Sequence, residues 1–218
     1  MADNYIITIQ RQFGSLGRPI AQKLAKLLNV EYYDRDIVEL TSKELNLPKS
    51  DIADIEEKSY GRMRYPLGLG HNHRKQDYLF SIQQCVIMEL ATHDKSCIIV
   101  GRCSDYVLRH YKNTINIFIY APYEARFYNC IHSLGMEEQE AKDMIREVDK
   151  ARNNYHKYYT GEPAATVEGR QFLIDSSMLG VDGTAELIAD IVRRAKEHGY
   201  GQEETESSSD IGSADDSE

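Results

Sequence analysis

The stretch 5–20, YIITIQRQFGSLGRPI, has the residue types and spacing that most directly suggest phosphate chemistry. Apolar residues give way to a turn with glycines and then to a helical pattern. A strand, a glycine turn and a helix N-terminus bind phosphate in α/β proteins, because backbone N–H groups and the helix dipole converge on the anion. Of the fixed positions in GxxxxGK(S/T), however, only Gly17 is kept, and Gln12, Arg18 and Pro19 occupy the others. By spacing alone, the stretch does not match this phosphate-binding motif. Whether it binds phosphate must therefore be judged from the rest of the chain.

Charged residues follow several of the predicted strands. In an open parallel sheet, ligands bind beyond the carboxyl ends of the strands, so these residues are expected to gather at one edge. They are three arginines and three carboxylates, namely Arg11, Arg35, Arg102, Asp34, Asp36 and Asp175. The planar fork of arginine offers phosphate two parallel hydrogen bonds, and carboxylates could hold ribose hydroxyls or Mg²⁺-bound water. The alternative is that they are ordinary solvated charges.

A charged helical segment, 137–158, carries a second cluster. Arg146, Asp149 and Arg152 are spaced so that they can share one helix face. Such a face could close over transferring phosphates, exclude water and neutralise developing charge. Taken alone, the segment is better explained as an exposed helix with ion pairs. Together with the arginines at the strand ends, it favours a phosphate loop rebuilt around Arg18.

Five short apolar stretches alternate with helical patterns, which predicts a three-layer α/β fold with a parallel sheet and right-handed crossovers. The predicted strands are 5–10, 30–33, 97–100, 114–120 and 173–175. The predicted helices are 17–28, 36–45, 78–93, 104–110, 122–133, 137–158 and 184–196. The segment 47–77 contains several prolines and glycines and has no clear period, which is typical of a functional lid, a binding loop or disorder.

Length and composition indicate one domain with a peripheral insertion. The chain has no apolar run of about 18 residues and no signal-peptide pattern, so a soluble, cytoplasmic protein without a membrane partner is expected. Seven of the nine net negative charges come from 202–218, a stretch expected to be disordered. The remainder of the chain has a net charge of −2 and no concentrated run of basic residues, which argues against a nucleic-acid partner.

The four cysteines share no CxxC spacing, which favours reduced, partly buried thiols over disulfides or a metal site. They are Cys85, Cys97, Cys103 and Cys130. His71 and His73 lie in a polar segment without carboxylate or thiol ligands nearby in sequence. We therefore expect no metal site built from protein ligands alone.

Six segments in sequence order resemble the cytidylate kinase-like family, a branch of the P-loop nucleoside monophosphate kinases. They are ITIQRQFGSLGR, EYYDRD, IIVGRCSDYVL, IFIYAPYEARF, DKARNNYHKYYTG and FLIDSSMLGVDGTAELI. The resemblance covers about 6–195. It implies a P-loop kinase-like domain over 1–199, with a five-stranded parallel sheet, a substrate-binding insertion at 46–77 and a helical lid at 135–165. The acidic tail, 200–218, lies outside it.

The resemblance also implies roles for individual residues, with ATP and Mg²⁺ as cofactors. The ATP-binding loop would comprise Gln12, Phe13, Gly14, Ser15, Leu16, Gly17 and Arg18. The acceptor would bind at Arg11, Asp34, Arg35, Asp36, Arg102 and Asp105. Catalytic charge would come from Arg18, Arg146, Asp149 and Arg152, and Arg126 lies on the helix after the fourth strand. Arg18 stands where relatives usually carry lysine, and Pro19 removes a hydroxyl that would ordinarily bind Mg²⁺.

The implied activity is ATP-dependent transfer of a phosphoryl group to a nucleoside monophosphate, CMP or dCMP by default, or to a related small acceptor. The departures at Arg18 and Pro19 motivate an alternative, a nucleotide-binding sensor or interaction module that has lost catalysis. A third hypothesis, a dinucleotide-binding oxidoreductase, is suggested by Gly14, Gly17 and Asp34 but lacks GxGxxG. The expected partner is a small nucleotide, and the oligomeric state stays open, a homodimer included.

Overall fold

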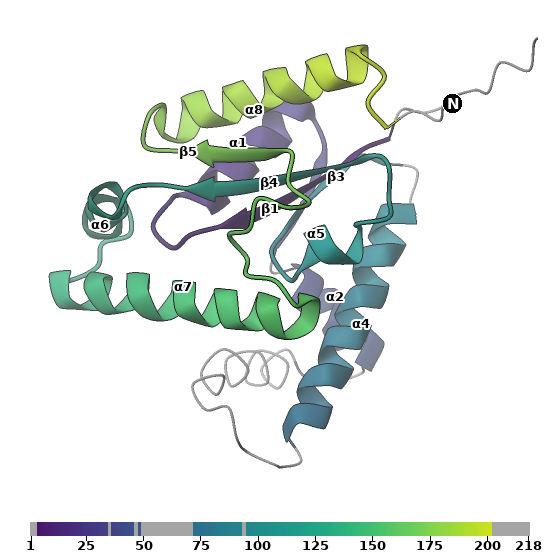
Figure 1. The fold of residues 1–218 in the computed structure, drawn as a ribbon, viewed down its shortest axis with the longest axis horizontal. Coiled ribbons are helices and arrows are strands. Elements are labelled where there is room, and N and C mark those ends of the chain that lie inside the picture. The colour runs from purple at the N-terminus through teal and green to yellow at the C-terminus, as the bar shows by residue number, and fades with distance from the viewer. Residues whose placement is uncertain (1–3, 35, 46–47, 49–71, 93–94, 202–218) are drawn as a thin grey trace, which may run out of the picture.

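Five parallel strands form the centre of the molecule, in the order β2-β3-β1-β4-β5 (Figure 1). The computed structural model describes residues 4–34, 36–45, 48, 72–92 and 95–201. The strands are β1 (Ile6–Arg11), β2 (Glu31–Tyr33), β3 (Cys97–Val100), β4 (Thr114–Tyr120) and β5 (Phe172–Asp175). All four strand pairings are parallel, so the predicted sheet is confirmed.

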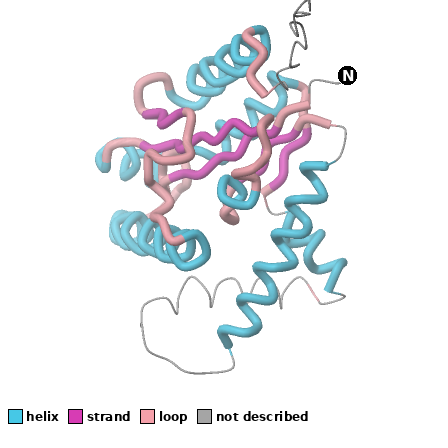
Figure 2. The backbone as a smooth tube through the Cα atoms, turned by 45° about the vertical axis from the view of Figure 1, so that its right-hand side comes forward, coloured by secondary structure: helices cyan, strands magenta, loops and turns pink. Residues whose placement is uncertain are grey.

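Helices cover both faces of the sheet, as the tube view in Figure 2 also shows. They are α1 (Gly17–Leu28), α2 (Asp36–Leu45), α4 (Asn72–Thr92), α5 (Ser104–Val107), α6 (Tyr123–His132), α7 (Glu138–Thr160) and α8 (Gly180–Glu197). The helices α1 and α8 lie over one face, and α4, α5 and α7 lie on the other side (Figure 1). The predicted three-layer arrangement is therefore correct.

Alternate residues of β1 face opposite sides of the sheet. Ile7 and Ile9 join the apolar core beneath α1 and α8. Thr8 and Gln10 are buried on the other face, where Thr8 Oγ1 donates to Asn116 Oδ1 at 2.6 Å. Buried polar groups require hydrogen-bond partners, so this face is organised by a polar network as well as by apolar packing.

Some helix boundaries differ from the predictions. The helix α4 begins at Asn72 rather than at 78, so it extends into the segment predicted as an insertion. The helix α8 begins at Gly180 rather than at 184, because Asp182 in its first turn favours the helix N-terminus despite two glycines. The short α5 ends at Val107, where a helix to 110 was predicted.

Several predictions fall on residues outside the described part of the chain. These are Arg35, His71, most of the 46–77 insertion and the acidic tail from 202 onward. The four cysteines are free thiols, of which Cys97, Cys103 and Cys130 are buried. Among the helices in the described ranges, none combines the length and the apolar character needed to cross a bilayer.

Candidate active site

Asp34 is the centre of an arginine cluster at the carboxyl edge of the sheet. It follows β2 and its side chain is buried. Arg18 Nε lies 2.5 Å from Asp34 Oδ2, while Arg11 Nη2 and Arg102 Nη1 lie 3.8 and 3.9 Å from Oδ1. Arg102 Nη1 also donates to the Asp34 carbonyl oxygen at 3.1 Å. Residues from β1, α1 and the turn after β3 thus converge on Asp34. Of the six strand-end charges, Arg11, Asp34 and Arg102 are brought together, and Arg18 joins them from α1.

The electrostatics of this cluster favour an anion. Burial raises the pKa of Asp34, but the neighbouring Arg11, Arg18 and Arg102 more than offset it, so the pKa lies below its ordinary value. The carboxylate therefore stays ionised at neutral pH. One carboxylate among three guanidinium groups leaves these four side chains with a charge of +2. Such a cluster is suited to a phosphate.

The turn after β3 has an unusual backbone that presents Arg102 to Asp34. Gly101, Arg102 and Cys103 have φ of +80°, +55° and +54°, three consecutive residues in the left-handed region. Non-glycine residues adopt this conformation at a cost of about 1–3 kcal/mol and are concentrated at functional sites. A Cβ on Gly101 would lie 2.7 Å from Arg11 Nη1, so a side chain there would push the Arg11 guanidinium aside.

The predicted phosphate loop connects β1 to α1, and two glycines let it pack closely. Gly14 has φ +77°, and a Cβ there would lie 2.8 Å from the Arg126 carbonyl oxygen. Gly17 begins α1, and its Cβ would lie 2.8 Å from Arg11 Cβ. The strand, glycine turn and helix predicted from the sequence are therefore present, although the lysine-type motif is not.

Hydrogen bonds to the adjacent strand ends fix this loop. Ser15 is fully buried, and its hydroxyl donates to the carbonyl oxygens of Gln12 and Ile119 at 2.9 and 3.2 Å. Ser176 Oγ donates to the Ser15 carbonyl oxygen at 2.8 Å. The Ala121 amide donates to Gln12 Oε1 at 3.2 Å. Gln12 and Ser15 therefore hold the loop in shape.

The helix α7, which lies within the segment predicted as a lid, also reaches the loop. Phe13 N donates to Asp149 Oδ1 at 2.7 Å, and Arg126 Nη1 donates to Asp149 Oδ2 at 2.5 Å. Arg152 Nη1 donates to the Arg11 carbonyl oxygen at 3.1 Å. Asp149 and Arg152 thus lie at the loop. Arg146 does not: its side chain is 69% exposed and pairs with acidic residues of α7 itself.

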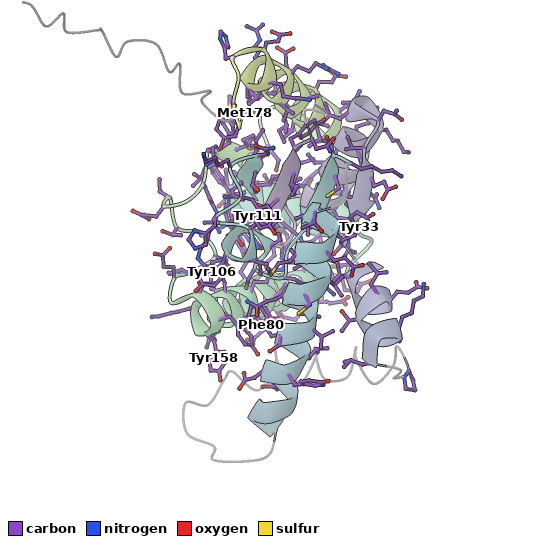
Figure 3. All side chains as sticks on the ribbon, turned by 90° about the vertical axis from the view of Figure 1, so that its right-hand side faces the viewer. Tyr33, Phe80, Tyr106, Tyr111, Tyr158 and Met178 are labelled. Carbon is purple, nitrogen blue, oxygen red and sulfur yellow. The ribbon has the colours of Figure 1, made fainter. Side chains whose placement is uncertain are left out.

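Aromatic packing fixes α7 against α4. Phe80 lies on α4 beside α7 (Figure 3), and its ring stacks on that of Tyr159 with centroids 3.8 Å apart. Tyr155 contacts both rings edge-on. Cys103, from the turn that carries Arg102, joins the same cluster. The packing therefore links α7 to the turn beside the arginine cluster.

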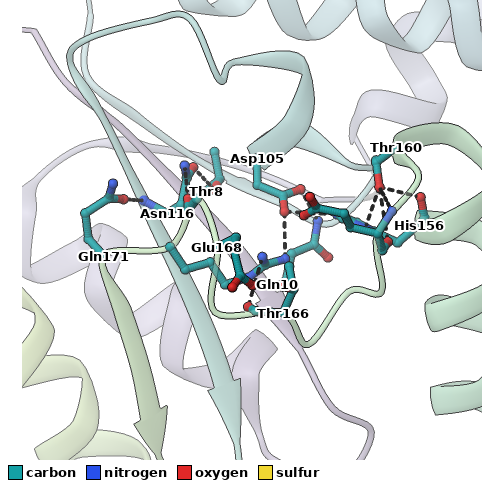
Figure 4. A network of polar contacts seen from close by, with 12 residues as sticks. Thr8, Gln10, Asp105, Asn116, His156, Thr160, Thr166, Glu168 and Gln171 are labelled. Carbon is teal, nitrogen blue, oxygen red and sulfur yellow. Dashed lines mark hydrogen bonds and ion pairs between the residues drawn. The ribbon is translucent and has the colours of Figure 1, made fainter.

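Asp105 lies in a second, buried network (Figure 4). Gln10 Nε2 donates to its Oδ1 at 2.9 Å, Arg170 Nη2 donates to Oδ2 at 2.7 Å, and His156 Nε2 lies 3.0 Å from Oδ2. Burial raises the pKa of Asp105, but the His156 hydrogen bond and the nearby positive charge lower it overall. The sequence pattern missed Gln10, His156 and Arg170, because no motif joins positions so far apart.

The remaining predicted residues contribute less to this site. Arg35 and the side chain of Asp36 lie outside the described part of the chain. Asp175 Oδ1 accepts hydrogen bonds from Ser177 N and Oγ at 2.9 and 2.7 Å, so it organises the turn into α8.

The donor set at the loop suits a phosphate better than a metal ion. The Phe13 amide donates to the Asp149 carboxylate, which shows that a loop amide can donate a hydrogen bond to an anionic oxygen. Magnesium prefers oxygen ligands. The Ser15 hydroxyl donates to backbone carbonyl oxygens of the protein, and Pro19 has no hydroxyl group. The Asp34 carboxylate is paired with arginines. In the part of the chain that the structure describes, no group of three or more acidic, histidine or cysteine side chains could hold a metal ion.

The sheet order, the loop and the helical layers define the P-loop kinase fold. The chain matches the family model of the cytidylate kinase-like family over residues 6–178 and belongs to that family. No curated protein matches the chain.

Two solved structures are similar over most of their length. An uncharacterized protein from Eubacterium ventriosum is 23% identical, with 87% of this chain and 99% of that chain covered and a TM-score of 0.65. A shikimate kinase from Bacteroides thetaiotaomicron is 11% identical, with coverages of 87% and 98% and a TM-score of 0.52. At these identities the similarity concerns the fold.

Proposed function

We propose that this protein is an ATP-dependent phosphotransferase that moves the γ-phosphoryl group to a nucleoside monophosphate, with CMP or dCMP as the default acceptor, or to a related small acceptor. The observation that carries the proposal is the convergence of Arg11, Arg18 and Arg102 on Asp34 beside the glycine loop. Membership of the cytidylate kinase-like family supports it.

The chain would act by positioning and electrostatics, because phosphoryl transfer needs little covalent chemistry from the protein. The loop amides and the N-terminus of α1 bind the ATP phosphates. Arg11 and Arg102, whose side chains are 13% and 11% exposed, hold the acceptor phosphate. Arg18 is 42% exposed, so it is the arginine that can turn from Asp34 to the transferring group.

Asp149 and Arg152 have a supporting role in this proposal. Their bonds to Phe13 N and to the Arg11 carbonyl oxygen hold the loop and the end of β1 in register with α7. Mg²⁺, when bound with ATP, supplies charge neutralisation at the phosphates. The described residues offer no evident ligand for it, so no step is assigned to the metal.

A second candidate function is nucleotide binding without catalysis, as a sensor or interaction module. Two observations favour it: Arg18 replaces the lysine and is paired with Asp34, and the Ser15 hydroxyl is turned into the protein. Arginine does not reproduce the compact charge of lysine at the β- and γ-phosphates.

The two functions are separated by measuring binding and turnover on the same sample. Calorimetry with ATP and Mg²⁺ gives the affinity, and ADP release with a panel of nucleoside monophosphates gives turnover. A phosphotransferase is expected to show both nucleotide binding and turnover. Binding without any product would favour the sensor, and no nucleotide binding would exclude both.

A further inference from the structure

Three polar side chains of α7 lie along one edge of the helix, and each contacts the rest of the fold. Asp149, Arg152 and His156 are spaced three and four residues apart, so they share one helix face. They contact the glycine loop, the end of β1 and α5, respectively. His156 is buried, whereas the other two are partly exposed, so its contact is the one best shielded from water.

Both ring nitrogens of His156 face oxygen acceptors. Nε2 lies 3.0 Å from Asp105 Oδ2 (Figure 4), and Nδ1 lies 2.7 Å from the Glu162 carbonyl oxygen. A carbonyl oxygen cannot donate, and the Asp105 carboxyl is ionised at neutral pH because its pKa lies below the ordinary value. The Thr160 hydroxyl, also near Nδ1, donates to the His156 carbonyl oxygen at 2.8 Å. Each ring nitrogen must therefore carry a proton, which makes the ring an imidazolium.

Asp105 connects this ring to the residues beside two arginines of the cluster. It lies on α5, three residues after Arg102, and its Oδ1 accepts from Gln10 Nε2 at 2.9 Å. Gln10 directly precedes Arg11 on β1. One buried carboxylate thus joins α7 both to β1 and to the turn that presents Arg102.

The other charges around the ring balance one another. Arg170 Nη2 donates to Asp105 Oδ2 at 2.7 Å, so these two side chains form a neutral pair. Burial raises the pKa of the nearby Cys103 thiol well above its ordinary value, which keeps it neutral. The cavity that His156 lines also contains three tyrosines and four further charged side chains, two of each sign: Arg109, Lys112, Glu162 and Glu168. If the ring lost a proton, a nitrogen lone pair would face one of its two oxygen partners, which is repulsive.

We propose that His156, as an imidazolium, is a positioning residue that docks α7 on the glycine loop and the end of β1, and that it thereby sets the affinity of the site for phosphate. The docking is present at low pH and is lost as the pH rises through the titration of the ring. The contacts of Asp149 and Arg152 depend on it because they lie on the same edge of α7. Only the effect on phosphate affinity rests on the proposed function.

Two adjacent amides report the docking of α7 separately from overall stability. Phe13 N donates to Asp149 Oδ1 on α7, whereas Gln12 N donates to the Ile119 carbonyl oxygen of β4 at 3.0 Å. Undocking of α7 exposes the Phe13 amide alone, and global unfolding exposes both amides to hydrogen exchange. The ratio of their exchange rates, each divided by its intrinsic rate, also cancels the pH dependence of the exchange chemistry.

His156→Gln removes the charge and one of the two ring donors, so it should raise the exchange ratio of Phe13 to Gln12 about tenfold, the effect of one hydrogen bond. In the unmodified full chain, the ratio should rise in step with the loss of the ring proton, followed by nitrogen-15 NMR on the same sample. His132→Gln is the matched control, because His132 is exposed on α6. It should leave the ratio and its pH dependence unchanged.

Calorimetry with ATP and Mg²⁺ tests the effect on phosphate affinity. While the ring is protonated, His156→Gln should bind ATP about tenfold more weakly than the unmodified protein. Once the ring is neutral, the two affinities should converge. Both proteins meet the same ligand, so the ionisation of ATP cancels in the comparison.

Four results would overturn the proposal. The first is a ring with one unprotonated nitrogen at every pH at which the protein is folded. The second is an exchange ratio that His156→Gln leaves unchanged, and the third is an equal acceleration of both amides, which would mean a structural role only. The fourth is an unchanged ATP affinity in a variant whose exchange ratio has risen. Absence of ATP binding in every protein, the unmodified one included, would contradict the proposed function, and the exchange ratio would still decide the docking.

Discussion

Arg18 Nε lies 2.5 Å from the Asp34 carboxylate, so this arginine near the start of α1 is held by the residue that follows β2. The pair connects the start of α1 to the neighbouring edge of the sheet. Arg11 and Arg102 approach the same carboxylate from the other side. The three guanidinium groups are thus gathered before any phosphate arrives, which lowers the free-energy cost of ordering them on binding.

Removing one of these arginines should weaken phosphate binding without unfolding the protein. We expect Arg18→Ala and Arg102→Ala each to weaken ATP or CMP binding by about 1.5–3 kcal/mol, the value of a hydrogen bond to a charged group. Arg146→Ala is the control, because its exposed side chain pairs with acidic residues of α7 itself among the described residues. Calorimetry would show that the site is misplaced if both cluster variants kept the unmodified affinity.

Asp34 should make stability depend on pH in the acid range. Its folded-state pKa lies below the ordinary 3.8, so ionised Asp34 stabilises the fold above that pH, and this contribution is lost as the pH falls through the lowered pKa. In Asp34→Asn the contribution is absent. The difference in unfolding free energy between the two proteins, measured with urea, should be largest near neutral pH and shrink as the pH falls below 3.8 and through the lowered pKa. A difference independent of pH would contradict the ion-pair account.

Asp149 should stabilise the contact between the loop and α7. Asp149→Asn weakens the bond from Phe13 N and removes the charge that faces Arg126, so we expect a loss of about 1–3 kcal/mol in unfolding free energy. Glu147→Gln, on the same helix but in an exposed pair with Arg146, should cost no more than about 1 kcal/mol. Chemical denaturation distinguishes them, and equal losses would mean that the Asp149 contacts are not stabilising.

Gly101 should matter for binding more than for stability. Gly101→Ala and Gly135→Ala place alanine at φ +80° and +70°, so both should lose about 1–2 kcal/mol of stability. Only the Gly101 variant places a Cβ 2.7 Å from Arg11 Nη1, whereas the Gly135 position is open. The affinity for ATP or CMP should therefore fall in Gly101→Ala and stay unchanged in Gly135→Ala. Equal affinities would show that Arg11 does not hold the ligand.

Local pattern was enough to predict the class of fold. The strands β1, β3 and β4 are buried on both faces, so each can be recognised in the sequence as a run of mostly apolar residues. Their alternation with helices implied parallel pairing, and parallel pairing implied that residues after the strands meet at one edge. Arg11, Asp34 and Arg102 could therefore be grouped from sequence. The predicted starts of helices α4 and α8 differ from those in the structure, because capping and tertiary contacts decide where a helix begins.

The sequence by itself determined the strands, the glycine turn and the gathering of arginines, because each depends on residues close together in the chain or on a general rule of parallel sheets. Only the tertiary structure decided that Asp149 and Arg152 face the loop while Arg146 faces solvent, since all three share a similar spacing on α7. It alone also placed Asp105 with Gln10, His156 and Arg170. Those contacts join residues 51–95 positions apart, and no local periodicity encodes which distant polar groups will satisfy one another once water is excluded.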